Sequence, residues 1–169
     1  MNLQLGAPLM LIAALLQATL LSRLRVLGGQ PDLVVVIALA WAVLDRGREG
    51  LFWAFVGGLC LDLFSGAPIG LSSLALTPIA FFIGLSDAGL YRTNIVIPIV
   101  FAGAGALGYH ILYALGLQFL AGMPVSWLEV TWYVMLPSVF FDLILIVPAL
   151  RLLGRSYDRM HPSAARLKP

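Results

Sequence analysis

Long apolar runs without charged residues occupy most of this chain and restrict it to folds suited to a hydrocarbon environment. The first run, residues 3–21, is about 19 residues long, enough to cross a hydrocarbon core of roughly 30 Å. Charged residues make up only 11% of the sequence and hydrophobic residues 61%, whereas soluble domains average about 25% charged residues. The sequence therefore predicts an all-α, polytopic membrane protein.

The apolar runs predict six transmembrane helices separated by short polar connectors. The second run is the shortest, and about 12 residues must be tilted or shielded by neighbouring helices to cross. A five-crossing arrangement without it is the alternative. Pro31 and Asp32 suit the start of this helix, and proline inside later runs, at Pro78, Pro137 and Pro148, is expected to bend or interrupt the helices. The expected helices are residues 3–21, 33–44, 51–64, 71–85, 95–121 and 132–153.

The positions of the basic residues predict the orientation in the membrane. With both termini cytoplasmic, Arg46, Arg48, Arg92 and a C-terminal cluster lie inside, and only Arg23 and Arg25 lie outside, as the positive-inside rule prefers. We therefore expect a transmembrane domain over residues 1–154 and a short basic cytoplasmic tail over residues 155–169. The net charge of +2 indicates topology and contact with anionic lipid rather than nucleic-acid binding. The C-terminal cluster consists of Arg151, Arg155, Arg159, Arg166 and Lys168.

The first run is expected to remain as a helix rather than to be removed as a signal peptide. No Lys or Arg precedes it, and it exceeds the usual signal core of about 7 to 15 residues. Removal as a signal peptide is the alternative.

Four polar side chains fall inside the apolar runs, namely Gln17, Asp62, His110 and Asp142. An acid facing lipid costs roughly 2.5 to 3.5 kcal/mol, so these groups must face protein, water or a partner. Either they form a proton- or ligand-linked site, or they satisfy one another and the backbone and fix helix register. Asp142 has the further alternative of a wet crevice opened by Pro137.

No metal site, cofactor or enzyme activity is expected. His110 has no histidine, cysteine or carboxylate companion at a metal-ligand spacing, and the single cysteine, Cys60, suits packing. The chain has no phosphate-binding glycine loop and no recognisable Ser-His-Asp arrangement. An intramembrane carboxyl pair of Asp62 and Asp142 is the weakest alternative.

Residues 51–71 carry the features most typical of a contact surface. Gly57 and Gly58 lie about one turn before Asp62 and allow another helix to approach the backbone closely. Pro68 and Gly70 then predict a tight turn. Two interpretations stay open, since the glycines either pack the third and fourth helices together or receive a partner protein.

The ordered motifs of residues 10–86 resemble the rod shape-determining protein MreD family, and the second half matches mainly in hydropathy. Each motif is weak alone, and their order and spacing make the resemblance specific. The motifs are Gln17-Ala18-Thr19, Pro31-Asp32-Leu33, Gly47 with Gly50, Gly57-Gly58-Leu59 with Asp62-Leu63, and Pro68-Ile69-Gly70-Leu71.

The resemblance implies a non-enzymatic scaffold of the bacterial cell-elongation machinery, located in the inner membrane and serving rod shape and peptidoglycan synthesis. Its implied partners are MreC and a wider complex of MreB, RodA and a peptidoglycan transpeptidase. The implied fold is similar to the substrate-binding subunits of energy-coupling factor transporters, although fold does not carry function with it. We expect MreC to contact the surface around Gly57, Gly58, Asp62, Pro68 and Gly70. The alternative is a vitamin-binding subunit of such a transporter, which would instead co-purify with an ATPase module or a retained vitamin.

Overall fold

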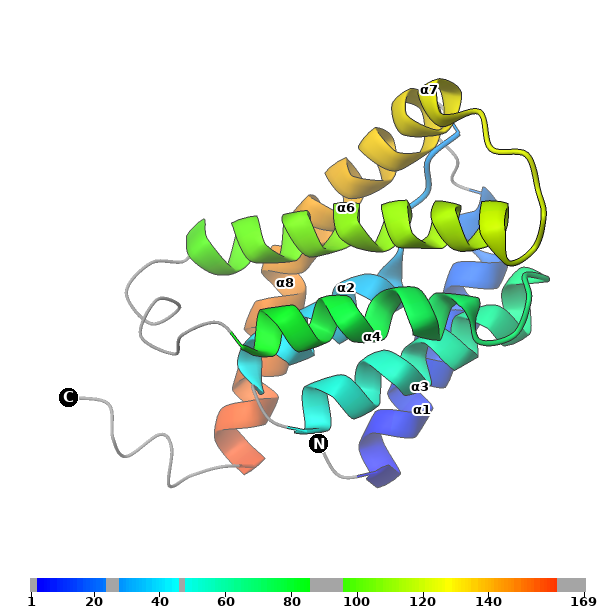
Figure 1. Ribbon diagram of the computed structural model, residues 1–169. Coiled ribbons are helices and arrows are strands. Elements are labelled where there is room, and N and C mark those ends of the chain that lie inside the picture. Colours follow the sequence, from blue (N-terminus) through cyan, green and yellow to red (C-terminus); the bar gives the residue numbers. More distant parts are fainter. Residues whose placement is uncertain (1–2, 24–27, 46–47, 86–95, 161–169) are drawn as a thin grey trace.

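A computed structural model describes residues 3–23, 28–45, 48–85 and 96–160 (Figure 1). Within these residues the chain is helical and contains no β-strand, which confirms the all-α prediction. The described residues also include three short helical segments, namely η1 (Leu21–Arg23), α7 (Trp127–Glu129) and the π-helix η2 (Val130–Met135). The long helices are α1 (Leu3–Thr19), α2 (Leu33–Leu44), α3 (Arg48–Ser65), α4 (Leu71–Gly84), α6 (Val96–Phe119) and α8 (Leu136–Met160).

The short helix α2 is the centre of the bundle. It contacts α1, α3, α4, α6 and α8, which surround it (Figure 1). Its side chains from Val34 to Val43 are buried apart from Ile37, and Trp41 and Leu39 are almost fully enclosed. The apolar length that is too short to face lipid is therefore shielded by the neighbouring helices.

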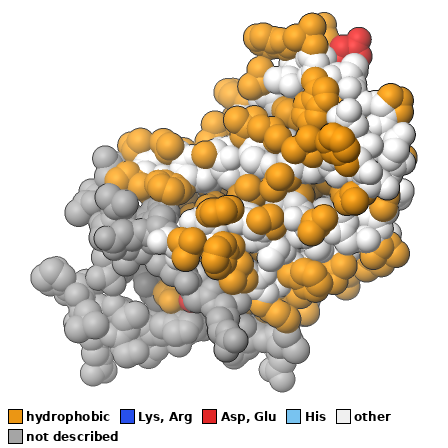
Figure 2. All heavy atoms as spheres, viewed as in Figure 1, with side chains coloured by type: hydrophobic (Ala, Val, Ile, Leu, Met, Phe, Trp, Pro, Cys, Tyr) orange, Lys and Arg blue, Asp and Glu red, His pale blue; other side chains and the backbone are white. Residues whose placement is uncertain are grey.

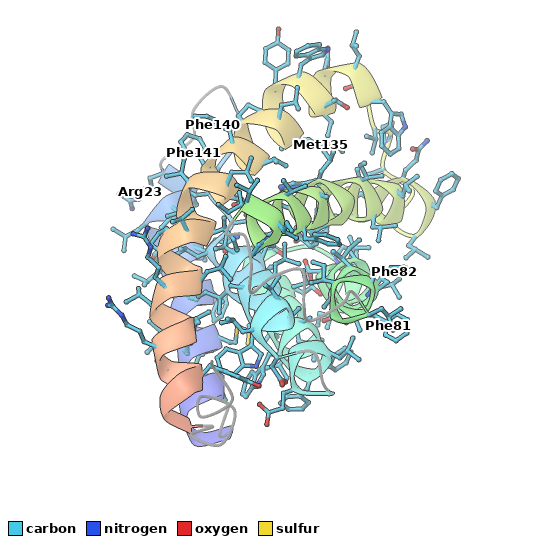
Figure 3. The ribbon with its side chains drawn as sticks, turned by 90° about the vertical axis from the view of Figure 1, so that its left-hand side faces the viewer. Arg23, Phe81, Phe82, Met135, Phe140 and Phe141 are labelled. Atoms are coloured by element: carbon cyan, nitrogen blue, oxygen red, sulfur yellow. The ribbon has the colours of Figure 1, made fainter. Side chains whose placement is uncertain are left out.

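The outer surface of the bundle is apolar, as a lipid-facing surface requires. Hydrophobic side chains cover much of the described part of the face shown in Figure 2. Phe81 and Phe82 of α4 lie on the opposite side of the bundle from Phe140 of α8 (Figure 3), and Phe82 and Phe140 are 67% and 62% exposed. Among the described residues, the segments Gly6–Arg23, Val96–Phe119 and Trp127–Tyr157 are long and apolar enough to span a membrane.

The last helical segment differs from the sequence prediction. Helical structure already begins at Trp127, five residues before the expected start at Trp132, and α8 continues through Pro148 without interruption. Just before Pro137 the helix widens into η2. Proline has no N–H and its ring clashes with the carbonyl group one turn earlier, and a π-helical segment is one way to accommodate it. The predicted interruption at Pro148 is therefore wrong.

Candidate functional site

The N-terminus of α2 lies inside the bundle, where its free backbone N–H groups need acceptors. The Asp32 N–H donates to Oδ1 of Asp142 on α8 at 2.9 Å, and the Val34 N–H donates to Oε1 of Gln17 on α1 at 3.1 Å. The Asp32 carboxylate makes no hydrogen bond to the first turn of its own helix. Two side chains from other helices thus cap α2.

The Asp32 carboxylate is then free to bind side chains. Its Oδ1 accepts a hydrogen bond from Nε2 of Gln17 at 2.6 Å, and its Oδ2 lies 3.4 Å from Nε2 of His110 on α6. Gln17 therefore acts twice, as an acceptor for the α2 backbone and as a donor to the Asp32 side chain.

His110 also faces Asp142, which lies at the midpoint of the Trp127–Tyr157 span. Its Nε2 is 3.8 Å from Oδ2 of Asp142. Asp32, His110 and Asp142 are 6%, 8% and 3% exposed, so the three side chains are isolated from solvent. We call Asp32, His110 and Asp142, together with Gln17, the central polar cluster.

Two atoms of the central polar cluster have no hydrogen-bond partner within the described part of the chain, namely Nε2 of His110 and Oδ2 of Asp142. Buried polar atoms are normally paired, because leaving one unpaired costs about 1 to 3 kcal/mol. The two atoms face each other and Oδ2 of Asp32, and the three groups have the composition of a metal-binding set.

Close packing of the segment before α2 against α8 places Asp32 in the cluster. A Cβ atom at Gly29 would lie 2.6 Å from Cβ of Pro137 and 2.8 Å from the backbone nitrogen of Ser138. In the same region the Gln30 N–H donates to Oγ of Ser138 at 3.1 Å. A glycine at residue 29 therefore allows the chain to reach α8 and to begin α2 beside Asp142.

Asp62 lies apart from this cluster and caps a different helix. Its Oδ2 accepts from the Gly70 N–H at 2.7 Å, and its Oδ1 accepts from the Ser72 N–H at 3.0 Å. Gly70 has a φ of +96°, a conformation that favours glycine, and this turn brings the first N–H groups of α4 to the carboxylate. Asp62 is 2% exposed and both of its oxygens accept hydrogen bonds.

The paired glycines of α3 contact helices of the same chain. A Cβ atom at Gly58 would lie 2.5 Å from both N and Cα of Ser73, so α3 and α4 touch backbone to backbone there. Gly57 faces Val34 of α2 and Met10 of α1. The close helix approach predicted from these glycines is present, and their predicted contact with a partner stays a prediction.

The sequence prediction brought Gln17, His110 and Asp142 forward, and the structure joins these three. It places Asp62 with the backbone of α4 instead. The prediction missed Asp32 as a member of the cluster, having assigned it only to the helix start. The short second apolar run could have revealed Asp32. A helix too short to cross the membrane unaided begins inside the protein, so the acid just before it is also buried there.

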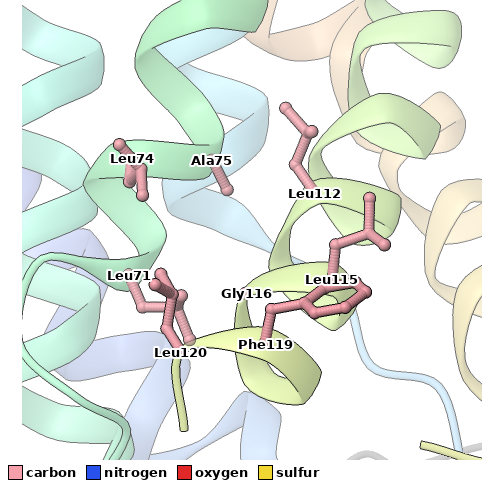
Figure 4. Close-up of a pocket in the computed structure, with 8 residues that line it drawn as sticks. All are labelled: Leu71, Leu74, Ala75, Leu112, Leu115, Gly116, Phe119 and Leu120. Atoms are coloured by element: carbon pink, nitrogen blue, oxygen red, sulfur yellow. The ribbon is translucent and has the colours of Figure 1, made fainter.

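A groove of about 240 Å³ lies between α4 and α6 (Figure 4). None of the residues that line it has a polar side chain, so it suits an acyl chain or an apolar side chain of another protein better than a polar small molecule. The lining residues are Leu71, Leu74, Ala75, Leu112, Leu115, Gly116, Phe119 and Leu120.

One protein family matches the chain over most of its length. A sequence model of that family, described as rod shape-determining protein MreD, matches residues 2–156 of the 169 residues. The match includes every member of the central polar cluster as well as Asp62. No curated protein and no solved structure matches the chain significantly. The likeness to substrate-binding subunits of energy-coupling factor transporters therefore stays a prediction.

Proposed function

This chain belongs to the MreD family of rod shape-determining proteins, and from that premise we propose that it is a non-enzymatic inner-membrane scaffold of the cell-elongation complex. In this role it binds MreC through faces of its transmembrane helices and so joins the wider assembly of MreB, RodA and a peptidoglycan transpeptidase. The observation that carries the proposal is the family match over residues 2–156. The apolar outer surface supports it, because a chain with short connectors meets its partners through helix faces.

The accessible part of the proposed MreC contact is the turn between α3 and α4. Gly57, Gly58 and Asp62 are buried, whereas the side chains of Leu63 and Ile69 are 63% and 74% exposed. The buried residues then have an indirect role, since they hold the turn against α4.

Pro68 and Gly70 fix the shape of this turn. Pro68 is exposed and Gly70 takes the left-handed conformation that ends the turn. In the proposed orientation the turn faces the periplasm, the side on which MreC carries its coiled coil.

Co-purification with MreC tests this contact. The double variant Leu63→Ala with Ile69→Ala is expected to lower MreC recovery roughly tenfold, which corresponds to a loss of about 1.4 kcal/mol in binding. Phe82→Ala is the matched control, because Phe82 is similarly exposed at 67% but lies near the other end of α4. Full MreC recovery with the double variant would contradict the proposed surface, and failure of the wild type to recover MreC would contradict the scaffold role.

The proposed topology has six crossings with both termini in the cytoplasm. Three of the described helical segments are long enough to span alone, α2 and α4 are shorter apolar helices, and α3 supplies the sixth crossing. Single cysteines at positions 27 and 47, which lie outside the described residues, test whether α2 crosses, with Cys60 replaced by serine. Labelling from opposite sides of the membrane is expected, and labelling from the same side would contradict six crossings.

A vitamin-binding role is not supported by the chain. Such a site needs several convergent polar groups in an accessible pocket. The groove between α4 and α6 is lined by apolar side chains and glycine, and the polar groups of the central polar cluster are buried. Retention of a vitamin or of an ATPase module during purification would favour this alternative over the scaffold.

A further inference from the structure

We propose that Asp32, His110 and Asp142 bind a divalent transition-metal ion of the zinc class at the centre of the membrane domain. The proposal is independent of MreC binding and concerns a site that the three ligands build from three separate parts of the chain. It departs from the sequence prediction, which found no metal-ligand spacing around His110. Spacing along the sequence detects only nearby ligands, whereas the two carboxylates come from the start of α2 and from α8.

The distances between the ligand atoms suit a small tetrahedral ion. Nε2 of His110 lies 3.4 Å from Oδ2 of Asp32 and 3.8 Å from Oδ2 of Asp142, and the three residues offer ligand atoms within 4.8 Å of one another. Zinc binds nitrogen and carboxylate oxygen at about 2.0 to 2.2 Å, so neighbouring ligand atoms in a tetrahedral site lie about 3.3 to 3.6 Å apart. The set therefore needs only small side-chain movements to enclose such an ion.

Each carboxylate accepts a hydrogen bond through Oδ1 and turns Oδ2 toward His110. Oδ1 of Asp32 accepts from Gln17, and Oδ1 of Asp142 accepts from the Asp32 N–H. The remaining oxygens, both Oδ2, face Nε2 of His110. Outer hydrogen bonds of this kind orient the ligands of metal sites and are part of their design.

Two of these ligand atoms also lack a hydrogen-bond partner among the described residues. Nε2 of His110 and Oδ2 of Asp142 have no hydrogen-bond partner among the described residues, and their side chains are 91% and 97% buried. A divalent cation would satisfy both atoms. It would also neutralise two buried carboxylates, which are costly in an apolar interior without compensation.

The choice of ion follows from the donor set. Imidazole suits zinc, copper, iron and nickel, whereas calcium takes six to eight oxygen ligands. One imidazole with two carboxylates leaves a fourth position for water or another ligand, as in three-ligand zinc sites. The competing arrangement has no metal ion, and a protonated His110 then pairs with the two carboxylates.

Metal content of the purified protein is the first test. The protein is prepared without a histidine tag, loaded with Zn²⁺, freed of excess metal and assayed for zinc by elemental analysis. About one zinc per chain is expected in the wild type, and at least tenfold less in His110→Gln and Asp142→Asn, which keep hydrogen-bonding side chains but weaken the ligand set. His161→Gln is the matched control, because it removes the other histidine of the chain and is expected to retain the zinc.

The visible spectrum of the Co²⁺-loaded wild type is the second test and needs no variant to fold. Co²⁺ in a tetrahedral site of nitrogen and oxygen ligands gives strong visible absorption bands, and we expect such bands here. Added Zn²⁺ is expected to displace the Co²⁺ and so abolish the bands. A wild type that retains no zinc and shows no such bands would overturn the proposal. Zinc retained by both His110→Gln and Asp142→Asn would also overturn it, because the ion would then lie elsewhere.

Discussion

The starts of α2 and α4 meet the same physical requirement in two different ways. Both are short apolar helices, and each receives at its first N–H groups a carboxylate from another helix. At α4 both oxygens of Asp62 accept backbone N–H groups, so the cap is complete. At α2 the carboxylates of Asp32 and Asp142 each keep one oxygen facing His110.

This difference separates a structural acid from a candidate binding acid. When both oxygens of a buried carboxylate accept hydrogen bonds from backbone N–H groups, neither oxygen is available to a ligand. Removing such a carboxylate affects only the fold. A carboxylate with a buried, unpaired oxygen can still bind a ligand through that oxygen, because the fold does not use it. Burial alone does not distinguish the two, because Asp62 and Asp142 are 2% and 3% exposed.

The largest effect is expected when the complete cap is removed. Asp62→Leu leaves the buried Ser72 N–H without its acceptor, at about 1 to 3 kcal/mol, and the part-buried Gly70 N–H at a smaller cost, so we expect a loss of roughly 2 to 4 kcal/mol in the free energy of unfolding. Asp62→Asn keeps one acceptor oxygen and is expected to lose about half as much or less. Thermal unfolding in detergent micelles measures both, and equal stability of the two variants would argue against a capping role.

The next effect tests the backbone contact that holds the α4 cap in place. In Gly58→Ala the new methyl group would lie 2.5 Å from backbone atoms of Ser73, which cannot move aside as a flexible side chain does. A loss of about 1 to 3 kcal/mol is expected from this overpacking. Gly154→Ala is the control, since its Cβ would meet only Leu44 at 3.8 Å. A Gly58→Ala protein as stable as the control would refute close packing of α3 on α4.

At the α2 start the corresponding test compares Asp142→Leu with Asp142→Asn, both measured in the presence of a chelator. Leucine removes the acceptor for the Asp32 N–H and is expected to cost about 1 to 3 kcal/mol, whereas asparagine keeps an oxygen there and costs less. The chelator separates this capping role from any bound ion. If assembly and melting temperature of both variants match the wild type, the cap at α2 carries no stability.

The smallest effect concerns the chain that leads into α2. Ser138→Ala removes the acceptor of the Gln30 N–H, and a loss of about 0.5 to 1.5 kcal/mol is expected, as for a typical single hydrogen bond. The exposed Ser156, which bonds the Leu152 carbonyl group within its own helix, provides the control Ser156→Ala with a change close to zero. If Ser138→Ala has the same melting temperature as the control, this contact does not position Asp32.

Local sequence patterns predicted most of the fold. The second helix was expected at residues 33–44 and α2 occupies Leu33–Leu44, because Pro31 and Asp32 mark its start and a polar loop marks its end. The close approach at Gly58 was also predicted, since small residues in an apolar run let another helix come close to the backbone. The rule that proline interrupts a helix failed at Pro148, which α8 accommodates within its length.

The site was less accessible to such patterns because its contacts are far apart in sequence. The Asp32 N–H bonds a side chain 110 positions away, and that of Gln30 bonds one 108 positions away. The residues within one helix turn of His110 or Asp142 do not indicate that these side chains contact Asp32. Gln17, His110 and Asp142 were recognised as costly polar groups, but their arrangement depends on how the helices pack, which hydropathy does not specify.

The measurement that tests the contrast between the two helix starts most directly is the zinc dependence of the melting temperature in wild type, Asp62→Asn and Asp142→Asn. Ligand at 100 times its Kd stabilises a protein by about 2.7 kcal/mol, which corresponds to roughly 5 to 10 °C for a chain of this size. We predict that zinc raises the melting temperature of the wild type and of Asp62→Asn relative to chelator, and leaves Asp142→Asn unchanged. An equal rise in Asp142→Asn, or no rise in the wild type, would contradict a zinc site formed by Asp142 beside the start of α2.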